Sequence, residues 1–185
     1  AQVADLMSKV KPLDFIITLG DNNYEVGGQD TIENHIGQFF HNFIYPFQGS
    51  SGAGAPNNTN RFFYSLGNHD ILGLNAALTS GPILSYLGPS VNTEWQTDPR
   101  KSRYYDYVWK GPGSVGDPVD FGGPIFNYQR PAIVVEENRP LLHFFSIDSD
   151  PHEPDGVTFD SNQAQWLKSR LEASDAKFNI DYNHH

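Results

Sequence analysis

Two short apolar runs in the sequence each end at a glycine that is followed at once by polar side chains. The first run, residues 15–19, leads into Asp21, and the second, residues 62–66, leads into the segment Asn68–Asp70. A short apolar run bounded by turn residues is typical of a buried strand. In open α/β sheets, ligands bind in a crevice at the carboxyl ends of the strands. The two motifs therefore predict one shared site, built from two loops.

Helix-like and strand-like patterns alternate along the rest of the chain. The helix-like segments are residues 1–10, 31–43, part of 71–87, and 161–171. The further strand-like segments are residues 104–109, 141–147 and 178–182. A turn-rich stretch, residues 111–123, is expected to form a lid or rim loop. The alternation predicts the α/β class, and 185 residues fit one domain that spans residues 1–185.

The composition excludes several classes of function. The formal net charge is −10, from 12 basic and 22 acidic residues, and no cluster of basic residues occurs. This balance argues against nucleic-acid binding and against anionic membrane surfaces. The chain has no cysteine, which excludes disulfides, thiolate zinc sites and cysteine nucleophiles. No apolar stretch has the length of a membrane span, so we expect none.

The polar residues of the two motifs are suited to metal-assisted chemistry. Carboxylate, amide and imidazole groups are ligands of hard and borderline metal ions, and a carboxylate such as Asp21 can bridge two of them. His69 can hydrogen-bond a phosphate oxygen or protonate a leaving group, and Asp70 can orient its ring. Taken alone, Asp21 is also compatible with an ordinary turn residue or helix cap. The combination favours phosphoester hydrolysis.

With these motifs the chain resembles the calcineurin-like metallophosphoesterase superfamily. The Gly-Asp element at Asp21 and the Gly-Asn-His-Asp element at Asn68–Asp70 match its second and third motifs in order. Tyr24, three residues after Asp21, resembles the metal-binding tyrosine of purple acid phosphatases, although a buried loop aromatic is the alternative. Residues 144–156 and 163–167 are similar to bacterial, especially cyanobacterial, members.

The resemblance implies a fold and a metal centre. The fold is a four-layer α/β/β/α sandwich, and the centre holds two metal ions, Fe(III) and a divalent ion (Zn, Mn or Fe). By the family pattern Asp21 bridges the two ions and Tyr24 binds the ferric ion. Asn68 and His184 bind the divalent ion by the same pattern. The terminal histidine pair is alternatively the remnant of a tag.

The resemblance also implies a reaction, the hydrolysis of a small phosphomonoester by a metal-activated hydroxide, as in acid phosphatases. His69 and Asp70 are the expected catalytic residues, and His185 is expected to contact the phosphate. His69, Asn22 and Asn23 are the expected substrate-binding residues.

Two family motifs are absent from the sequence, and this leaves a second interpretation open. An opening Asp-x-His motif is expected before residue 1 and a closing Gly-His-x-His motif after residue 185, so the sandwich is expected to be incomplete at both ends. Asp181 departs from the family pattern as a charge within a core strand, which is costly unless it is paired. The alternative is therefore a non-catalytic extracellular structural or assembly domain that keeps the fold.

Two further features concern the surface. Asn57 begins a glycosylation sequon in a Gly/Ser/Asn-rich loop. Together with the acid-phosphatase resemblance, the sequon favours an extracellular or periplasmic location. The acidic loop Asp148–Asp155 is an exposed turn by composition, and a third interpretation is a calcium-binding loop. Its alternating oxygen-bearing residues are Asp148, Asp150, Glu153 and Asp155.

Overall fold

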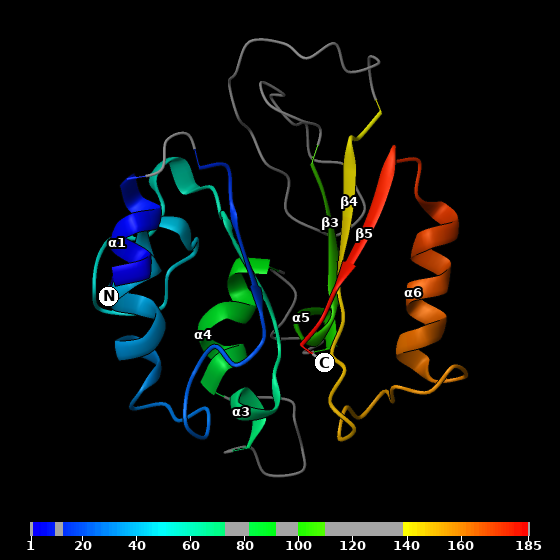
Figure 1. Ribbon diagram of the computed structural model, residues 1–185, viewed down its shortest axis with the longest axis horizontal. Coiled ribbons are helices and arrows are strands. Elements are labelled where there is room, and N and C mark those ends of the chain that lie inside the picture. Colours follow the sequence, from blue (N-terminus) through cyan, green and yellow to red (C-terminus); the bar gives the residue numbers. More distant parts are fainter. Residues whose placement is uncertain (1, 10–12, 73–81, 92–99, 110–138, 185) are drawn as a thin grey trace.

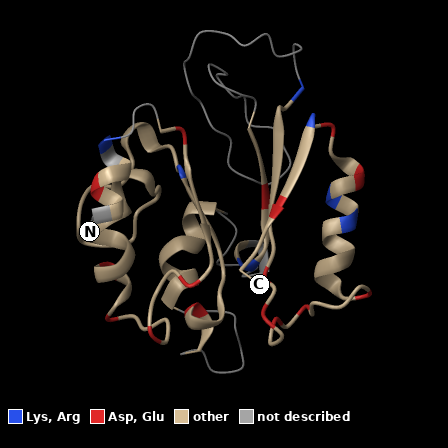
Figure 2. Cartoon of the chain, in the orientation of Figure 1, with Lys and Arg blue, Asp and Glu red and all other residues tan. Residues whose placement is uncertain are grey.

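The computed structural model describes residues 2–9, 13–72, 82–91, 100–109 and 139–184, and it shows a mixed α/β protein with two small sheets (Figure 1). Helices lie on the outer sides of the sheets, and one apolar core cluster includes residues of both sheets and of the helical segments beside the first sheet. Strands β1, β2, β4 and β5 all finish at the same end of the molecule, where several Asp and Glu residues lie on the loops (Figure 2).

The first sheet contains the two strands that end in the sequence motifs. β1 (Ile16–Leu19) runs parallel to β2 (Phe62–Ser65), with Ile16 opposite Phe62. Every residue of β2 is buried, as expected for a strand of a parallel sheet. The elements before and between them are α1 (Gln2–Lys9), η1 (Glu33–Gly37), α2 (Gln38–Phe40), η2 (His41–Phe43) and η3 (Pro56–Asn58).

The second sheet has the order β3-β4-β5. Its strands are β3 (Tyr105–Trp109), β4 (Leu142–Ser146) and β5 (Phe178–Tyr182). β3 is antiparallel to β4, whereas β4 and β5 are parallel and are joined through α6 (Asn162–Ala173). The Ser161 hydroxyl caps α6 by accepting a 3.2 Å hydrogen bond from the Ala164 amide. α6 lies along the outer face of this sheet (Figure 1).

Aromatic side chains join the inner faces of the two sheets. The rings of Phe63 and Tyr107 stack with their centroids 4.0 Å apart, and Phe15 meets Phe144 edge-on at 5.5 Å. The Tyr64 carbonyl accepts a 2.9 Å hydrogen bond from the Ser146 hydroxyl across the interface. Aromatic pairs of this kind contribute about 0.5–1.5 kcal/mol each beyond their burial. The two ring pairs therefore stabilise the packing of the two sheets against each other.

Most of the elements predicted from the sequence are confirmed. The segment predicted as one helix over residues 31–43 is helical, but it is divided into π, α and 3₁₀ turns. Helical structure around residues 71–87 occurs in α3 (Asn68–Ile71), which begins inside the motif, and in α4 (Pro82–Val91). α5 (Arg100–Arg103) leads into β3. The predicted loop at residues 111–123 lies outside the described residues.

Two expectations about the environment of the chain can be compared with the structure. Asp181 lies on β5, one of the two edge strands of the described sheet, and its side chain is exposed. The desolvation cost expected for a charge in a core strand therefore does not arise. Among the described helices, none combines the length and the apolar character needed to cross a membrane.

Candidate functional site

The two predicted motifs meet at the carboxyl ends of β1 and β2, as the sequence indicated. Asp21 has a φ of 51°, and its Oδ1 accepts a 3.1 Å hydrogen bond from the His69 amide. The approach is close, because a Cβ atom at Gly67 would lie 2.3 Å from the Asp21 nitrogen. Glycine at position 67 therefore allows the two loops to touch.

The second carboxylate oxygen of Asp21 is the centre of the site. The Tyr24 hydroxyl donates a 2.7 Å hydrogen bond to Oδ2, and Nε2 of His184 lies 3.3 Å from the same oxygen. Nδ1 of His184 lies 2.7 Å from the Leu19 carbonyl, which can only accept a hydrogen bond. Nδ1 therefore carries a proton and donates to this carbonyl, which leaves Nε2 as the ring nitrogen that faces Asp21.

The electrostatics of the site favour an ionised Asp21. Partial burial opposes ionisation, but hydrogen bonds from Tyr24 and the His69 amide and the nearby His184 outweigh it, so the pKa of Asp21 lies below its usual value. The hydrogen bond to this carboxylate raises the pKa of Tyr24. Tyr24 therefore keeps its proton here, and a cation would have to replace that proton to bind the phenolate.

His69 is held by a group other than the one predicted. Its Nδ1 lies 2.5 Å from the Glu25 carbonyl, and its ring lies against Tyr24 with the centroids 4.6 Å apart. The prediction that Asp70 orients this ring is wrong, because the Asp70 carboxylate turns toward the other loop. The ring remains half-buried beside Tyr24, at the edge of the Asp21 cluster.

The buried Asp70 carboxylate joins the two loops through hydrogen bonds to both of them. It is fully buried, and its Oδ1 accepts a 2.9 Å hydrogen bond from the Asn23 amide. Its Oδ2 accepts from Nδ2 of Asn22 at 2.8 Å and from the Gly67 amide at 3.0 Å. Burial raises the pKa of Asp70 although these donors oppose the shift. The carboxylate therefore serves as a structural junction.

The two asparagines predicted to bind substrate also turn inward, and this corrects their assignment. Nδ2 of Asn22 donates to the Ser65 carbonyl at 2.8 Å as well as to Asp70. The Asn23 side chain is fully buried; it donates to the Gly28 carbonyl and accepts from the Thr31 hydroxyl at 2.9 Å. Their amides are satisfied inside the protein, so they shape the loop that carries Asp21 and Tyr24.

The remaining residues of the predicted metal centre can be placed in part. Asn68 is the half-buried first residue of α3, next in sequence to His69. His185 lies outside the described residues. Among the residues that are described, no three side chains of the His, Cys, Asp and Glu types form a metal-binding group. The cluster at Asp21 consists of one carboxylate, one imidazole and one phenol.

The structure contains a second polar cluster, of which the sequence predicted only the acidic part. The acidic loop after β4 was recognised, but its partner Arg103, at the end of α5, was not. The guanidinium lies 2.8 Å from both Glu153 and Asp155, and all three side chains are largely buried. Two of the four acidic residues proposed as calcium ligands, Glu153 and Asp155, are thus paired with an arginine. Fifty residues separate Arg103 from Glu153, so no local pattern could have signalled the pair.

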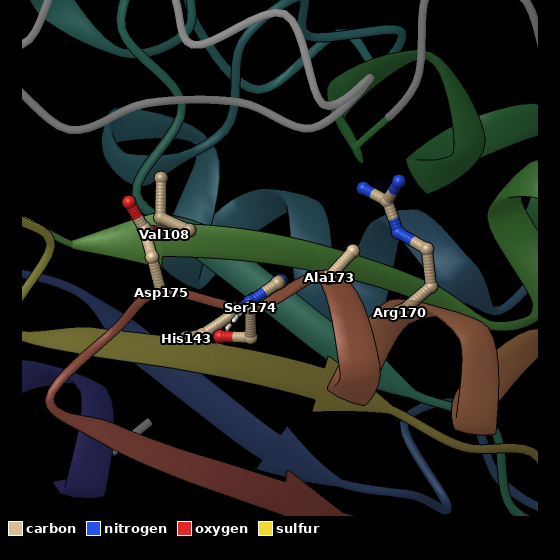
Figure 3. Close-up of a pocket in the computed structure, with 6 residues that line it drawn as sticks. All are labelled: Val108, His143, Arg170, Ala173, Ser174 and Asp175. Carbon is tan, nitrogen blue, oxygen red and sulfur yellow. Dashed lines mark hydrogen bonds between the residues drawn. The ribbon is translucent and has the colours of Figure 1, made fainter.

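The pocket in Figure 3 lies on the face of the second sheet that α6 covers. Nδ1 of His143 lies 2.9 Å from the Ser174 hydroxyl, and its Nε2 lies 2.7 Å from Asp106. This arrangement has the order of a Ser-His-Asp triad. Ser174, however, also bonds Asn179 and Ala176 at the C-terminal end of α6, where the helix dipole disfavours an alkoxide. The cluster therefore joins α6 to the sheet.

Comparisons with known proteins leave the chain without an assigned family. No protein-family model matches it. Neither a curated protein nor a solved structure matches it either.

Proposed function

We propose that the protein is a metal-dependent phosphoester hydrolase with an acid-phosphatase-like site. The observation that carries the proposal is the convergence on Oδ2 of Asp21. The Tyr24 hydroxyl and the His184 imidazole reach this one oxygen at 2.7 Å and 3.3 Å, from the same loop and from a segment 163 positions later in the chain. Packing alone does not require this combination of side chains.

The architecture supports the proposal. Two sheets meet face to face through aromatic residues, and helices lie on their outer sides. This arrangement is compatible with the four-layer sandwich that the resemblance implies. The candidate residues lie where β1, β2 and β5 end, the position at which α/β proteins bind their ligands.

The side chains at the site fit the proposed metal centre chemically. Tyr24 as phenolate would suit Fe(III), Nε2 of His184 and the Asn68 amide oxygen would suit a divalent ion, and the Asp21 carboxylate would contribute to the binding of both. When bound, the metal ions would lower the pKa of a water molecule and neutralise phosphoryl charge. Oδ1 of Asp21 stays with the His69 amide, so the loop fixes the direction of the carboxylate.

His69 would act on the substrate side of the site. With Nδ1 donating to the Glu25 carbonyl, the other ring nitrogen of the protonated ring would donate a hydrogen bond to a phosphoryl oxygen or a proton to the leaving group. We propose a small phosphomonoester as substrate, since a net charge of −10 repels polyanions. We also propose export from the cytoplasm, which agrees with an exposed Asn57 in its sequon.

The rival function is a non-catalytic extracellular assembly domain. The inward hydrogen bonds of Asn22, Asn23 and Asp70 favour it, because they show polar residues of the motifs used as scaffold. It predicts that the Asp21 cluster binds no metal.

Metal analysis and visible spectroscopy on protein from its native source distinguish the two functions. The hydrolase predicts about two metal ions per chain, one of them iron, and a tyrosinate-to-iron absorption band that Tyr24→Phe removes. His184→Gln should lower the metal content, whereas His152→Gln, at a side chain that is 85% exposed, should not. Absence of stoichiometric metal would reject the hydrolase and favour the assembly domain.

A further inference from the structure

The carboxyl group of Asp148 is buried with too few hydrogen-bond donors for an anion. Asp148 follows β4 and is only 1% exposed. Its Oδ1 accepts a 3.0 Å hydrogen bond from the Asp150 amide, but its Oδ2 is buried with no hydrogen-bond partner among the described residues. An ionised carboxylate in such a place loses its hydration without replacement, which is energetically costly.

The groups around Asp148 add negative charge. Glu153 and Asp150, both at most 5% exposed, are its acidic neighbours. Arg103 from α5 does not neutralise Asp148, because it binds both oxygens of Glu153 and one oxygen of Asp155. The Gln163 side chain from α6 bonds only the backbone of Asp148, at 2.9 Å and 2.8 Å.

The other polar groups on this turn are also engaged. Oδ1 of Asp150 accepts a 2.8 Å hydrogen bond from the His152 amide and lies 2.8 Å from Nδ1 of the exposed His152 ring. The Tyr104 hydroxyl donates to Asp155 at 3.0 Å. The Arg103 guanidinium therefore faces a turn with four acidic side chains, and among the described residues the excess negative charge falls on Asp148.

We propose that Asp148 keeps its proton in the folded protein at neutral pH and shares it with Glu153. The turn after β4 is then held together by a hydrogen bond between these two carboxyl groups. A protonated carboxyl group gains the donor that Oδ2 lacks, and Glu153 is the neighbouring acceptor. A proton also needs no cavity, whereas a calcium ion needs six to eight oxygen ligands. The inference does not rest on the proposed function.

The electrostatics agree with this geometry. Burial, with added repulsion from Glu153 and Asp150, raises the pKa of Asp148 from 3.8 to about 8. Between these two values the folded state holds a proton that the unfolded state has lost. The contribution of Asp148 to stability is therefore largest in acid and falls as the pH rises through that window. Above about pH 8 both states are ionised, and the contribution is constant.

The test compares the wild-type chain with Asp148→Asn, which keeps the shape and is neutral at every pH. Urea unfolding of both proteins from about pH 5 to about pH 9 gives the ratio of their unfolding constants. Relative to the variant, the wild-type unfolding constant should rise about tenfold per pH unit and level off near pH 8. Asp160→Asn, at an exposed position, should run parallel to wild type through the neutral range.

Infrared spectroscopy provides a second readout, which can be taken on the wild-type protein itself. At neutral pH the wild-type protein should show the carbonyl stretch of a protonated carboxyl group, and this band should disappear in alkaline solution and in Asp148→Asn. A wild-type spectrum without the band, or a ratio of unfolding constants that does not change with pH, would overturn the proposal. Stabilisation of wild type but not of Asp148→Asn by calcium would also overturn it, since Asp148 would then be a cation ligand.

Discussion

The His69 amide donates a 3.1 Å hydrogen bond to Oδ1 of Asp21, and the two oxygens of this carboxylate therefore have different roles. Oδ1 belongs to the scaffold that joins the turn after β1 to the start of α3. Oδ2 is left for Tyr24 and His184. A carboxylate fixed in this way is preorganised, because its direction is set before any ligand arrives.

Gly67→Ala should destabilise the protein and disturb the site together. The added Cβ would lie 2.3 Å from the Asp21 nitrogen and 2.4 Å from its Oδ1, so one loop must move. We expect a loss of about 1–3 kcal/mol in the free energy of unfolding, measured by urea denaturation. Gly28→Ala is the control, since its nearest neighbour is the end of the exposed Asp30 side chain. Equal stability of both variants would contradict the tight contact.

Asp70→Asn should loosen the junction of the two loops. Oδ2 of Asp70 accepts from both Asn22 and Gly67, and Oδ1 accepts from Asn23. An amide has only one acceptor oxygen, so at least one donor is left facing an NH₂ group. The loss should be about 1–3 kcal/mol, accompanied by faster hydrogen exchange at the Asn23 or Gly67 amide. Unchanged exchange at both amides would show that the junction does not depend on the carboxylate.

Asp21 should make the protein more stable above pH 4 than below it. Its pKa is lower in the folded state than its usual 3.8. The stabilisation is present above the unfolded value and is lost as the pH falls through the lower, folded value. Asp21→Asn should therefore flatten the stability curve on its acid side, below about pH 5, by a modest amount because solvent screens this site. Asp30→Asn, at an exposed side chain, should leave the curve unchanged.

Arg103→Met should be among the most damaging single substitutions. It leaves Glu153 buried without its counter-charge, which costs about 3–5 kcal/mol, measured as the change in the free energy of unfolding. The double variant Arg103→Met/Glu153→Leu should recover part of this loss, because it removes the more deeply buried of the two carboxylates that Arg103 pairs with, Glu153 rather than Asp155. Lys168→Met is the matched control. Its partner Glu172 is 4.0 Å away and both side chains are about two-thirds exposed, so little change is expected.

The sequence was informative where a local pattern carried the signal. Apolar runs and turn residues predicted β1 and β2, and the rule on carboxyl ends predicted that Asp21 and His69 would meet. Contacts between distant segments gave no such signal. The Arg103–Glu153 pair spans fifty positions, and the antiparallel pairing of β3 with β4 depends on how the chain crosses between them. The sequence could not show that the side chains of Asn22 and Asn23 bond groups inside the protein. An asparagine that supports a loop has the same local sequence as one that binds a ligand.

The contact between His184 and the end of β1 has a consequence for how the protein is made. The His184 ring hydrogen-bonds the Leu19 carbonyl, 165 positions earlier in the chain, and it fills the space that a side chain at Gly20 would take. A nascent chain therefore presents Asp21 and Tyr24 on the ribosome long before the histidine has been synthesised. The cluster cannot close until residue 184 has emerged from the ribosome, so the site is completed well after the loop that carries Asp21 and Tyr24 has been made.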